Sequence, residues 1–492
     1  MIPTPPTRAP RLLGGLLLVL AAAPSSAGDA ERLVAALLGE TPLAADLRSL
    51  TDEVGGRPTG SAANLQSVEW GLARFRAAGV EARKEPFTMP ALWLERSARA
   101  SVKGGVTFVA QVAAMPYSVG TAPGGVAAAL LDGGTGSGED FARLGGKAKG
   151  AFVLIETAEL VDLAGLFKEY NEAAAIEKRA FAASVAGVVY MGSRPRNLLY
   201  RHNASLGPKN AHPMLVMERE AAQRAQRLIR AGADLELTAD LEVESAGPYE
   251  SWNVVGEITG AEKPEEIVVI GAHLDSWDLG TGALDNACNV ALVIDVARQI
   301  QALGLRPRRT IRFVLWNGEE QGLFGSWGYA KSRAAELDRH LITVTLDIGS
   351  GRVGGFFTGG RAELLPVVER ALEPVAGLGP FAQVDEPIVG TDNFDFMLEG
   401  VANLVANQEP ANYGPNYHAR SDTFDKVDLR QLRLNAAVAA ALTWGLAQGE
   451  VTWRRQSRAE VEKLVESTSL KEQMASFGLL EAWQNGTRGR KK

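Results

Sequence analysis

The stretch from Val268 to Asp285, VVIGAHLDSWDLGTGALD, constrains this chain more than any other part of it. Its apolar run stops at His273, a carboxylate follows two residues later at Asp275, and Asp285 closes the segment before a helix-like pattern. A short apolar run that ends abruptly in polar residues is typical of a buried strand reaching the edge of a sheet. A histidine and two aspartates around a glycine-rich loop at such an edge predict a metal site.

Strands and helices alternate after Ser251, and this order indicates a mostly parallel sheet covered by helices. The expected strands are Ile267–Ile270, Thr310–Trp316, Leu341–Leu346 and Val401–Val405, and the expected helices are Asn286–Leu303, Gly325–Arg339 and Leu429–Leu446. Asp285 or Asn286 is the expected N-cap of the first of these helices. The pattern predicts an α/β fold with a mixed, mostly parallel sheet sandwiched by helices.

Acidic residues and histidines follow four of these strands. In open α/β sheets, ligands bind beyond the carboxyl ends of the strands. The residues at these ends are His273 with Asp275, Glu319 with Glu320, Asp347, and His418 with Asp422. Imidazole and carboxylate together suit Zn²⁺, and Co²⁺ or Mn²⁺ bind the same ligands. Because one zinc ion needs about three protein ligands, the larger set predicts two ions about 3.5–4 Å apart, with Asp285 as a bridging carboxylate.

The adjacent pair Glu319 and Glu320 suggests a division of roles. Neighbouring residues that leave a strand point in different directions, so one can bind a metal ion while the other stays free beside an attacking water. A free carboxylate there can take a proton from the water and deliver it to a leaving amine. Asp275 is better suited to fixing the ring of His273 by a hydrogen bond, which metal-bound histidines require. The pattern therefore predicts a hydrolytic site.

These motifs resemble the dinuclear zinc exopeptidase family of secreted aminopeptidases and glutamate carboxypeptidases. The matching segments are HLDSWDLGTGALDN (His273–Asn286), LWNGEEQGLFGS (Leu315–Ser326), TLDIGSG (Thr345–Gly351), YHARSDTFDKVD (Tyr417–Asp428) and RPTGSAANLQSVEW (Arg57–Trp70). The resemblance implies two zinc ions held by Asp285 as the bridge, by Glu320 and His418 on one ion, and by His273 and Asp347 on the other. It also implies that Glu319 is the general base and acid.

The sequence pattern changes between residues 121 and 245, where short apolar runs alternate with glycine-rich turns. Gly145–Glu156 and Glu177–Met191 resemble the protease-associated domain. The predicted organisation is a signal peptide (1–27), a catalytic domain (28–120 and 246–450), an inserted protease-associated-like α/β domain (121–245), and a C-terminal helix with a basic tail (451–492). We expect the insert to form a lid or wall over the substrate cleft or to be purely structural, and the tail to be solvated.

Export is expected from the N-terminal residues. Arg8 and Arg11 precede the apolar stretch Leu12–Ala23, and small residues follow at 25–27, which is the order of a secretory signal peptide. The alternative is an uncleaved anchor; no later stretch is apolar enough to form an integral membrane segment, so we expect a periplasmic or extracellular protein. The net charge of −7 gives no support for a nucleic-acid partner. A single cysteine, Cys288, excludes an internal disulfide.

The favoured function is an exported zinc exopeptidase acting on the ends of short peptides or dipeptides, as a carboxypeptidase or dipeptidase. An aminopeptidase on the same metals is the first alternative. A non-catalytic binding protein on the same fold is an alternative of another class. Tyr413, Tyr417 and Asp392 are candidate substrate-binding residues, and the family resemblance suggests a homodimer.

Overall fold

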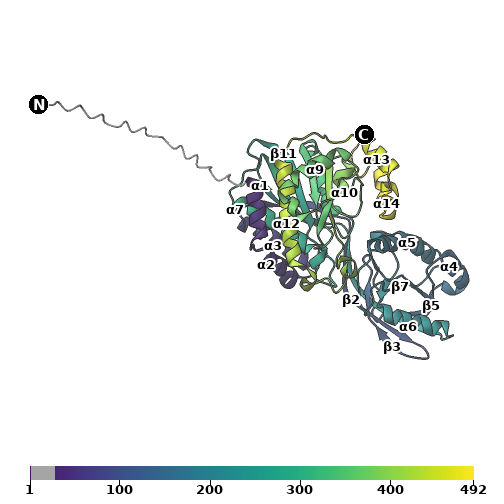
Figure 1. Cartoon of the computed structure of the whole chain (residues 1–492). Coiled ribbons are helices and arrows are strands. Elements are labelled where there is room, and N and C mark those ends of the chain that lie inside the picture. Colours follow the sequence, from purple (N-terminus) through teal and green to yellow (C-terminus); the bar gives the residue numbers. More distant parts are fainter. Residues whose placement is uncertain (2–27, 492) are drawn as a thin grey trace.

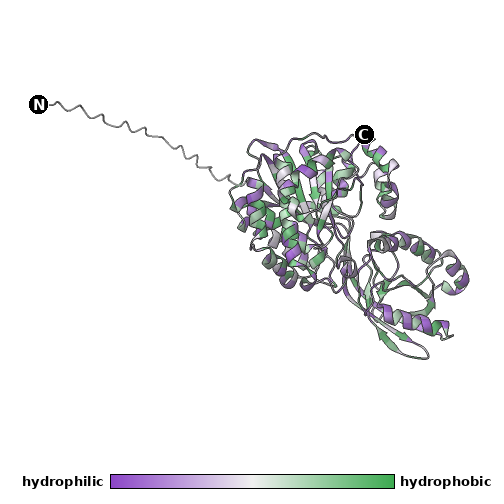
Figure 2. Ribbon diagram, in the orientation of Figure 1, coloured by the Kyte–Doolittle hydropathy of each residue, from purple (hydrophilic) through white to green (hydrophobic). Residues whose placement is uncertain are grey.

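The computed structural model of the chain describes Met1 and residues 28–491, and within these residues it contains two separate sheets (Figure 1). The expected signal peptide lies, apart from Met1, outside the described residues. Figure 2 shows apolar residues concentrated along the strands and the inner faces of the helices, as expected for elements that bury one face or both.

The first sheet has seven strands in the order β1-β10-β12-β11-β13-β15-β14. They are β1 (Glu81–Met89), β10 (Tyr249–Ile258), β11 (Lys263–His273), β12 (Arg309–Trp316), β13 (His340–Thr345), β14 (Val353–Phe357) and β15 (Ala402–Gln408). The four neighbours β12, β11, β13 and β15 run parallel, while β1, β10 and β14 pair antiparallel. The predicted mixed, mostly parallel sheet is therefore confirmed.

Alternate residues of the central strands face two different helix layers. Val268 and Ile270 of β11 pack into the larger core, whereas Ile267 and Val269 face the opposite side. The larger core includes α1 (Asp29–Leu38), α2 (Leu43–Arg48), α3 (Ala62–Ala77), α7 (Cys288–Ala302), α9 (Leu365–Ala371) and α12 (Leu429–Gln448). The opposite face carries α8 (Phe324–Ser332) and α10 (Asn393–Leu398). Helices on both faces explain why these strands are continuous apolar runs.

Two helix boundaries differ from the prediction. α7 begins at Cys288 after a turn of π-helix over Ala283–Ala287, and Ala287 occupies its N-cap without a side-chain cap. The expectation that Asp285 or Asn286 caps this helix is wrong, because both have non-helical backbone angles and their side chains bind elsewhere. The helix expected over 325–339 ends at Ser332, and a separate turn of 3-10 helix covers 337–339.

The second sheet belongs to a module formed by residues 92–246, which we call the inserted module. Its eight strands follow the order β3-β2-β9-β5-β6-β7-β8-β4. They are β2 (Leu92–Lys103), β3 (Phe108–Ala110), β4 (Val112–Ala114), β5 (Val126–Asp132), β6 (Phe152–Ile155), β7 (Gly187–Met191), β8 (Met214–Met217) and β9 (Leu235–Ala246). Its helices are α4 (Gly138–Leu144), α5 (Leu163–Ala182) and α6 (Arg219–Arg230).

The inserted module starts earlier in the chain than the predicted insert. β2 begins at Leu92, within the range 28–120 expected for the catalytic domain, and pairs along its length with β9. The chain enters the module from β1 through β2 and leaves it through β9 to β10, and Figure 1 shows β2 at the junction of the two parts. The module has its own apolar core.

The C-terminal residues form three short helices, α13 (Arg458–Ser467), α14 (Leu470–Ser476) and α15 (Leu480–Gln484). The expectation of a solvated basic tail is wrong for Arg488, which is 3% exposed. Its guanidinium lies 2.6 Å from the buried carboxylate of Asp395 on α10, and this charge pair holds the end of the chain against α10. Among the helices of the described residues, none is long and apolar enough to cross a membrane.

Candidate metal centre

The structure brings five predicted residues into two buried groups at the carboxyl edge of the first sheet. One group contains His273, Asp285 and Asp347, and the other contains Asp285, Glu320 and His418. Within each group the candidate ligand atoms lie within 4.8 Å of one another. The groups meet because parallel strands end at the same edge: in the register of β11 and β12, His273 lies opposite Trp316, just before the loop that carries Glu320.

Asp285 lies between the two histidines. Nε2 of His273 is 3.0 Å from Oδ1 of Asp285 and 2.9 Å from Oδ1 of Asp347. Nε2 of His418 is 2.8 Å from Oε2 of Glu320 and 3.4 Å from Oδ2 of Asp285. The two oxygens of Asp285 thus face different histidines, which is the arrangement of a carboxylate that bridges two ions.

Backbone carbonyls fix the orientation of both imidazole rings. Nδ1 of His273 donates to the carbonyl of Asp275 at 3.0 Å, and Nδ1 of His418 donates to the carbonyl of Arg201 at 3.2 Å. A proton held at Nδ1 leaves the Nε2 lone pair free for a metal ion. The carboxylate of Asp275 is 3.9 Å from the His273 ring, so Asp275 orients this histidine through its backbone.

The electrostatics of the two groups fit divalent cations. Oδ2 of Asp285 and Oε1 of Glu320 are buried and have no hydrogen-bond partner among the described residues. Burial and the nearby Asp285 raise the pKa of Glu320 well above its usual value. Burial alone would lower the pKa of His273, but the Asp347 and Glu319 carboxylates raise it well above its ordinary value. Buried carboxylates with unpartnered oxygens need compensating positive charge, which a metal ion supplies.

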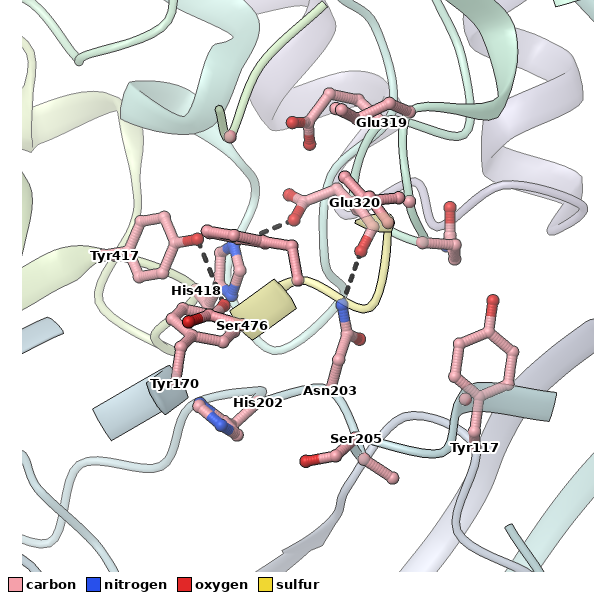
Figure 3. Close-up of a pocket in the computed structure, with 18 residues that line it drawn as sticks. Tyr117, Tyr170, His202, Asn203, Ser205, Glu319, Glu320, Tyr417, His418 and Ser476 are labelled. Carbon is pink, nitrogen blue, oxygen red and sulfur yellow. Dashed lines mark hydrogen bonds and ion pairs between the residues drawn. The ribbon is translucent and has the colours of Figure 1, made fainter. Parts of the chain in front are cut away.

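Glu319 stays outside both groups. It is half-buried, and its side chain lines a cavity beside Glu320 (Figure 3). Burial, together with the charges of Asp347 and Glu320, raises the pKa of Glu319 well above its usual value. The structure therefore separates the adjacent glutamates, with one among the candidate ligands and the other free beside them.

Thr59 and Asp275 connect the loops that carry these residues. The hydroxyl of Thr59 donates to Oδ2 of Asp275 and accepts from the N–H of Gly318, both at 2.9 Å. The carboxylate of Asp275 also accepts from the N–H groups of Glu319 and Glu320, each at 3.4 Å. The loop after β11 and the loop after β12 are thus joined by one buried network.

Arg57 holds the loop that leads from His273 to Asp285. Its guanidinium is fully buried and donates to the carbonyls of Leu274 at 2.5 Å, Thr281 at 2.8 Å and Gly282 at 3.1 Å. Burial lowers the pKa of Arg57 to about 10, so it remains a cation at neutral pH. The sequence identified Arg57 and Thr59 only within a turn and a family motif.

Asp422 supports the candidate bridge from the other side. Its two oxygens accept from the N–H groups of Leu284 at 2.6 Å and Asp285 at 3.1 Å. Burial raises the pKa of Asp422 to about 7. Its position after His418 was the only sequence signal for it, and this signal did not reveal its contact with the distant Asp285 backbone.

Two cavities open beside the candidate ligands. The smaller, about 200 Å³, is lined by Glu319, Glu320 and His418 together with Tyr117, Asn203 and Ser205 of the inserted module (Figure 3). The larger, about 530 Å³, borders Asp347 and is mainly apolar. Its apolar lining includes Leu166, Phe167, Ile348, Phe357, Ile388, Val389 and Val405. Tyr170, Gly390, Tyr417, Ser476 and Phe477 line both cavities.

The three candidate substrate residues have different positions. Tyr413 lines the larger cavity, and Tyr417 lines both while its ring stacks on that of His418, with centroids 3.6 Å apart. Asp392 is fully buried and is not among the residues that line either cavity, so the structure does not place it where a substrate would touch it.

The fold and the site together define a class of protein, an α/β metallopeptidase with its candidate metal ligands at the ends of parallel strands. Residues 253–443 match the profile of peptidase family M28. The predicted family resemblance and enzyme class are confirmed.

Known relatives extend the likeness beyond the matched residues. The chain is 26% identical to carboxypeptidase Q of Bos taurus over 409 residues, covering 82% of this chain and 85% of the relative. A peptidase M28 precursor from Shewanella amazonensis has a TM-score of 0.77 at 28% identity, covering 87% of this chain and 98% of its own. BSAP, a zinc aminopeptidase from Bacillus subtilis, shares the fold with a TM-score of 0.66 at 21% identity, covering 84% and 96% of the two chains.

Proposed function

We propose that the chain is an exported dinuclear zinc exopeptidase that acts on short peptides. The observation that carries the proposal is the carboxylate of Asp285, whose two oxygens face His273 and His418 from the centre of two buried ligand groups. Zinc, with Co²⁺ or Mn²⁺ as possible substitutes, polarises a peptide carbonyl and activates water when bound to such ligands.

Glu319 acts as the general base and acid in this proposal. Its carboxylate is free of the ligand groups and lines the smaller cavity, where a scissile bond beside Glu320 would lie. It takes the proton of the attacking water on a carboxylate oxygen and then delivers it to the nitrogen of the leaving amine. The two ligand groups would hold metal ions whose positive charge would offset that of Asp347 and Glu320 and so favour the ionised form of Glu319.

The walls of the two cavities favour the end of a peptide over its middle. The catalytic domain supplies Tyr417, the inserted module supplies Tyr170, and the C-terminal helices supply Phe477. Cavities of about 200 and 530 Å³ have room for one or two residues each side of a scissile bond. This supports action on short peptides with free ends.

The charges around the cavities favour the amino end of the peptide. Among the described residues that line them there is no lysine or arginine, the side chains that usually clamp a terminal carboxylate. Burial lowers the pKa of His202 to about 4, so it is neutral at pH 7. Glu472, which lines the larger cavity and is not among the candidate ligands, instead offers a carboxylate that suits an ammonium group. We therefore favour an aminopeptidase or dipeptidase over a carboxypeptidase.

Blocked dipeptides test both the activity and its direction. The zinc-loaded protein is assayed on leucyl-alanine, on its N-acetyl form and on its C-amide. We expect hydrolysis of the free and amidated forms and none of the acetylated form. Hydrolysis of the acetylated form with loss of activity on the amide would assign a carboxypeptidase. No hydrolysis together with no bound zinc by elemental analysis would instead favour the binding-protein alternative.

Export is tested separately. The predicted signal peptide at 1–27 implies that the protein recovered from the periplasm or the medium starts near Gly28. N-terminal sequencing measures this directly. Recovery of the uncleaved chain from the membrane fraction would support the anchor alternative.

A further inference from the structure

We propose that the C-terminal segment, residues 451–491, is part of the substrate site, and that Phe477 at the end of α14 determines which terminal side chain the site accepts. The proposal rests on the proposed peptidase function. The segment lies beyond residues 253–443, which match the family profile, and its sequence predicted only a helix and a solvated basic tail.

The segment is attached to the catalytic domain by an apolar cluster. On one side of the cluster are buried side chains of the helices α13, α14 and α15, namely Val461, Leu470, Met474 and Trp483. On the other side are Val389, in the loop before α10, and Phe394 of α10. Apolar side chains buried on both sides of a contact indicate stable packing and exclude a freely solvated segment.

Polar contacts extend from this segment to both loops that border the cavities. The side-chain oxygen of Gln473 accepts from the N–H of Val389 at 3.0 Å, beside the larger cavity. Arg488, paired with Asp395, donates to the carbonyl of Gly322 at 3.4 Å, in the loop that also carries Glu319 and Glu320. The segment therefore fixes the edges of both cavities and forms part of their walls.

An aromatic row lines both cavities, because Phe477, Tyr170 and Tyr417 each contribute to the wall of both. Phe477 stacks on Tyr170 of α5 with ring centroids 5.7 Å apart and an interplanar angle of 28°. The hydroxyl of Tyr170 lies 3.3 Å from that of Tyr417, whose ring stacks on the candidate ligand His418. Figure 1 shows α14 facing α5, and Figure 3 shows Tyr170, Tyr417 and Ser476 around one space. The C-terminal segment and the inserted module thus complete the wall together.

This position gives Phe477 control over the size of the accepted side chain. A terminal side chain that enters the larger, apolar cavity next to Asp347 would meet the Phe477 ring in the wall of that cavity. Removing the Phe477 ring would open the wall that it contributes to both cavities. Large and small substrate side chains would then make more similar contacts with the protein, and the preference between them would decrease. Since one methylene in an apolar pocket changes kcat/KM by about 10-fold or more, the loss of a whole ring should be readily measurable.

The test compares Phe477→Ala and Phe477→Trp with the zinc-loaded wild type. Kinetic constants are measured on alanyl-alanine, leucyl-alanine and phenylalanyl-alanine, and zinc content and thermal unfolding are measured alongside. We expect Phe477→Ala to reduce the preference between these dipeptides by about 10-fold, through KM more than kcat. Phe477→Trp should shift the preference toward alanyl-alanine. The matched control is Phe381→Ala, which removes a partly buried phenylalanine that lines neither cavity and should leave the preference unchanged.

Unchanged preference in both folded variants of Phe477 would overturn the proposal and leave α14 a purely structural role. If Phe477→Ala fails to fold, Phe477→Leu replaces it. If the wild type hydrolyses none of the dipeptides, the proposed function fails; calorimetric binding of the same dipeptides then decides the inference. Equal relative affinities in wild type and variants would refute it, and a reduced spread of affinities in Phe477→Ala would support it.

Discussion

Replacing Thr59 with valine removes one hydroxyl while nearly preserving the shape of the side chain. This hydroxyl connects two loops of the candidate site, because it donates to Asp275 in one loop and accepts from the N–H of Gly318 in the other. Thr59 is 2% exposed and Asp275 is fully buried, so water cannot easily replace either bond.

The magnitude follows from the two broken bonds. A buried carboxylate that loses one donor costs about 1.5–3 kcal/mol, and an N–H left without an acceptor costs about 1–3 kcal/mol. Part of this is recovered by relaxation, so we expect the free energy of unfolding to fall by about 2–4 kcal/mol. Because Asp275 also holds the N–H groups of Glu319 and Glu320, a shift of this turn by about 1 Å would lower kcat by about 100-fold.

Urea unfolding and steady-state kinetics on leucyl-alanine measure the two effects. Thr443→Val is the matched control, because Thr443 is fully buried and its hydroxyl has no hydrogen-bond partner in the described part of the chain. That control should be neutral or slightly stabilising. Thr59→Ser restores the hydroxyl and should recover most of the activity. Wild-type stability and kcat in Thr59→Val would show that the hydroxyl does not connect the two loops functionally.

Four further predictions concern single residues. Glu319→Gln should lower kcat by about 10²–10⁴-fold with zinc content unchanged, and wild-type activity would remove Glu319 from the mechanism. Asp285→Ala should lose metal as well as activity, and two tightly bound ions in elemental analysis would exclude it as the bridge. Arg488→Met leaves Asp395 buried and unpaired, which should cost about 3–5 kcal/mol in urea unfolding; a change under about 1 kcal/mol would contradict this reasoning. Burial lowers the pKa of His340 to about 4. Neutral His340 stabilises the fold fully above its unfolded pKa of about 6.5. This stabilisation is lost as the pH falls toward 4, and the free energy of unfolding decreases by about 3 kcal/mol over that range. His340→Gln should flatten this acid limb of stability, and an unchanged pH dependence would contradict the assignment.

Local patterns in the sequence predicted which residue types lie at the strand ends, whereas the choice of Glu320 over Glu319 as a ligand came from the family resemblance. His273, Glu320 and Asp347 each follow an apolar strand, and parallel strands bring their carboxyl ends to one edge of the sheet. Strand order and ligand type can therefore be read from neighbouring residues. The N-cap prediction failed at Asp285 because its side chain contacts His273 and His418, and its backbone is not helical.

The remaining features depend on contacts between segments far apart in the chain. β2 pairs with β9 across more than a hundred residues, so the start of the inserted module at Leu92 had no local signal. The burial of Arg488 depends on Asp395, and the roles of Thr59 and Arg57 depend on loops more than two hundred residues away.

The sequence by itself determined the α/β fold and the residue types at the strand ends, because periodicity and strand termination are local properties of the chain. Only the tertiary structure decided that Asp285 faces both histidines, that Asp275 orients His273 through its backbone, and that Phe477 meets Tyr170. These contacts arise because buried charges and apolar rings require partners, and the folded chain selects those partners from segments that the sequence does not place side by side.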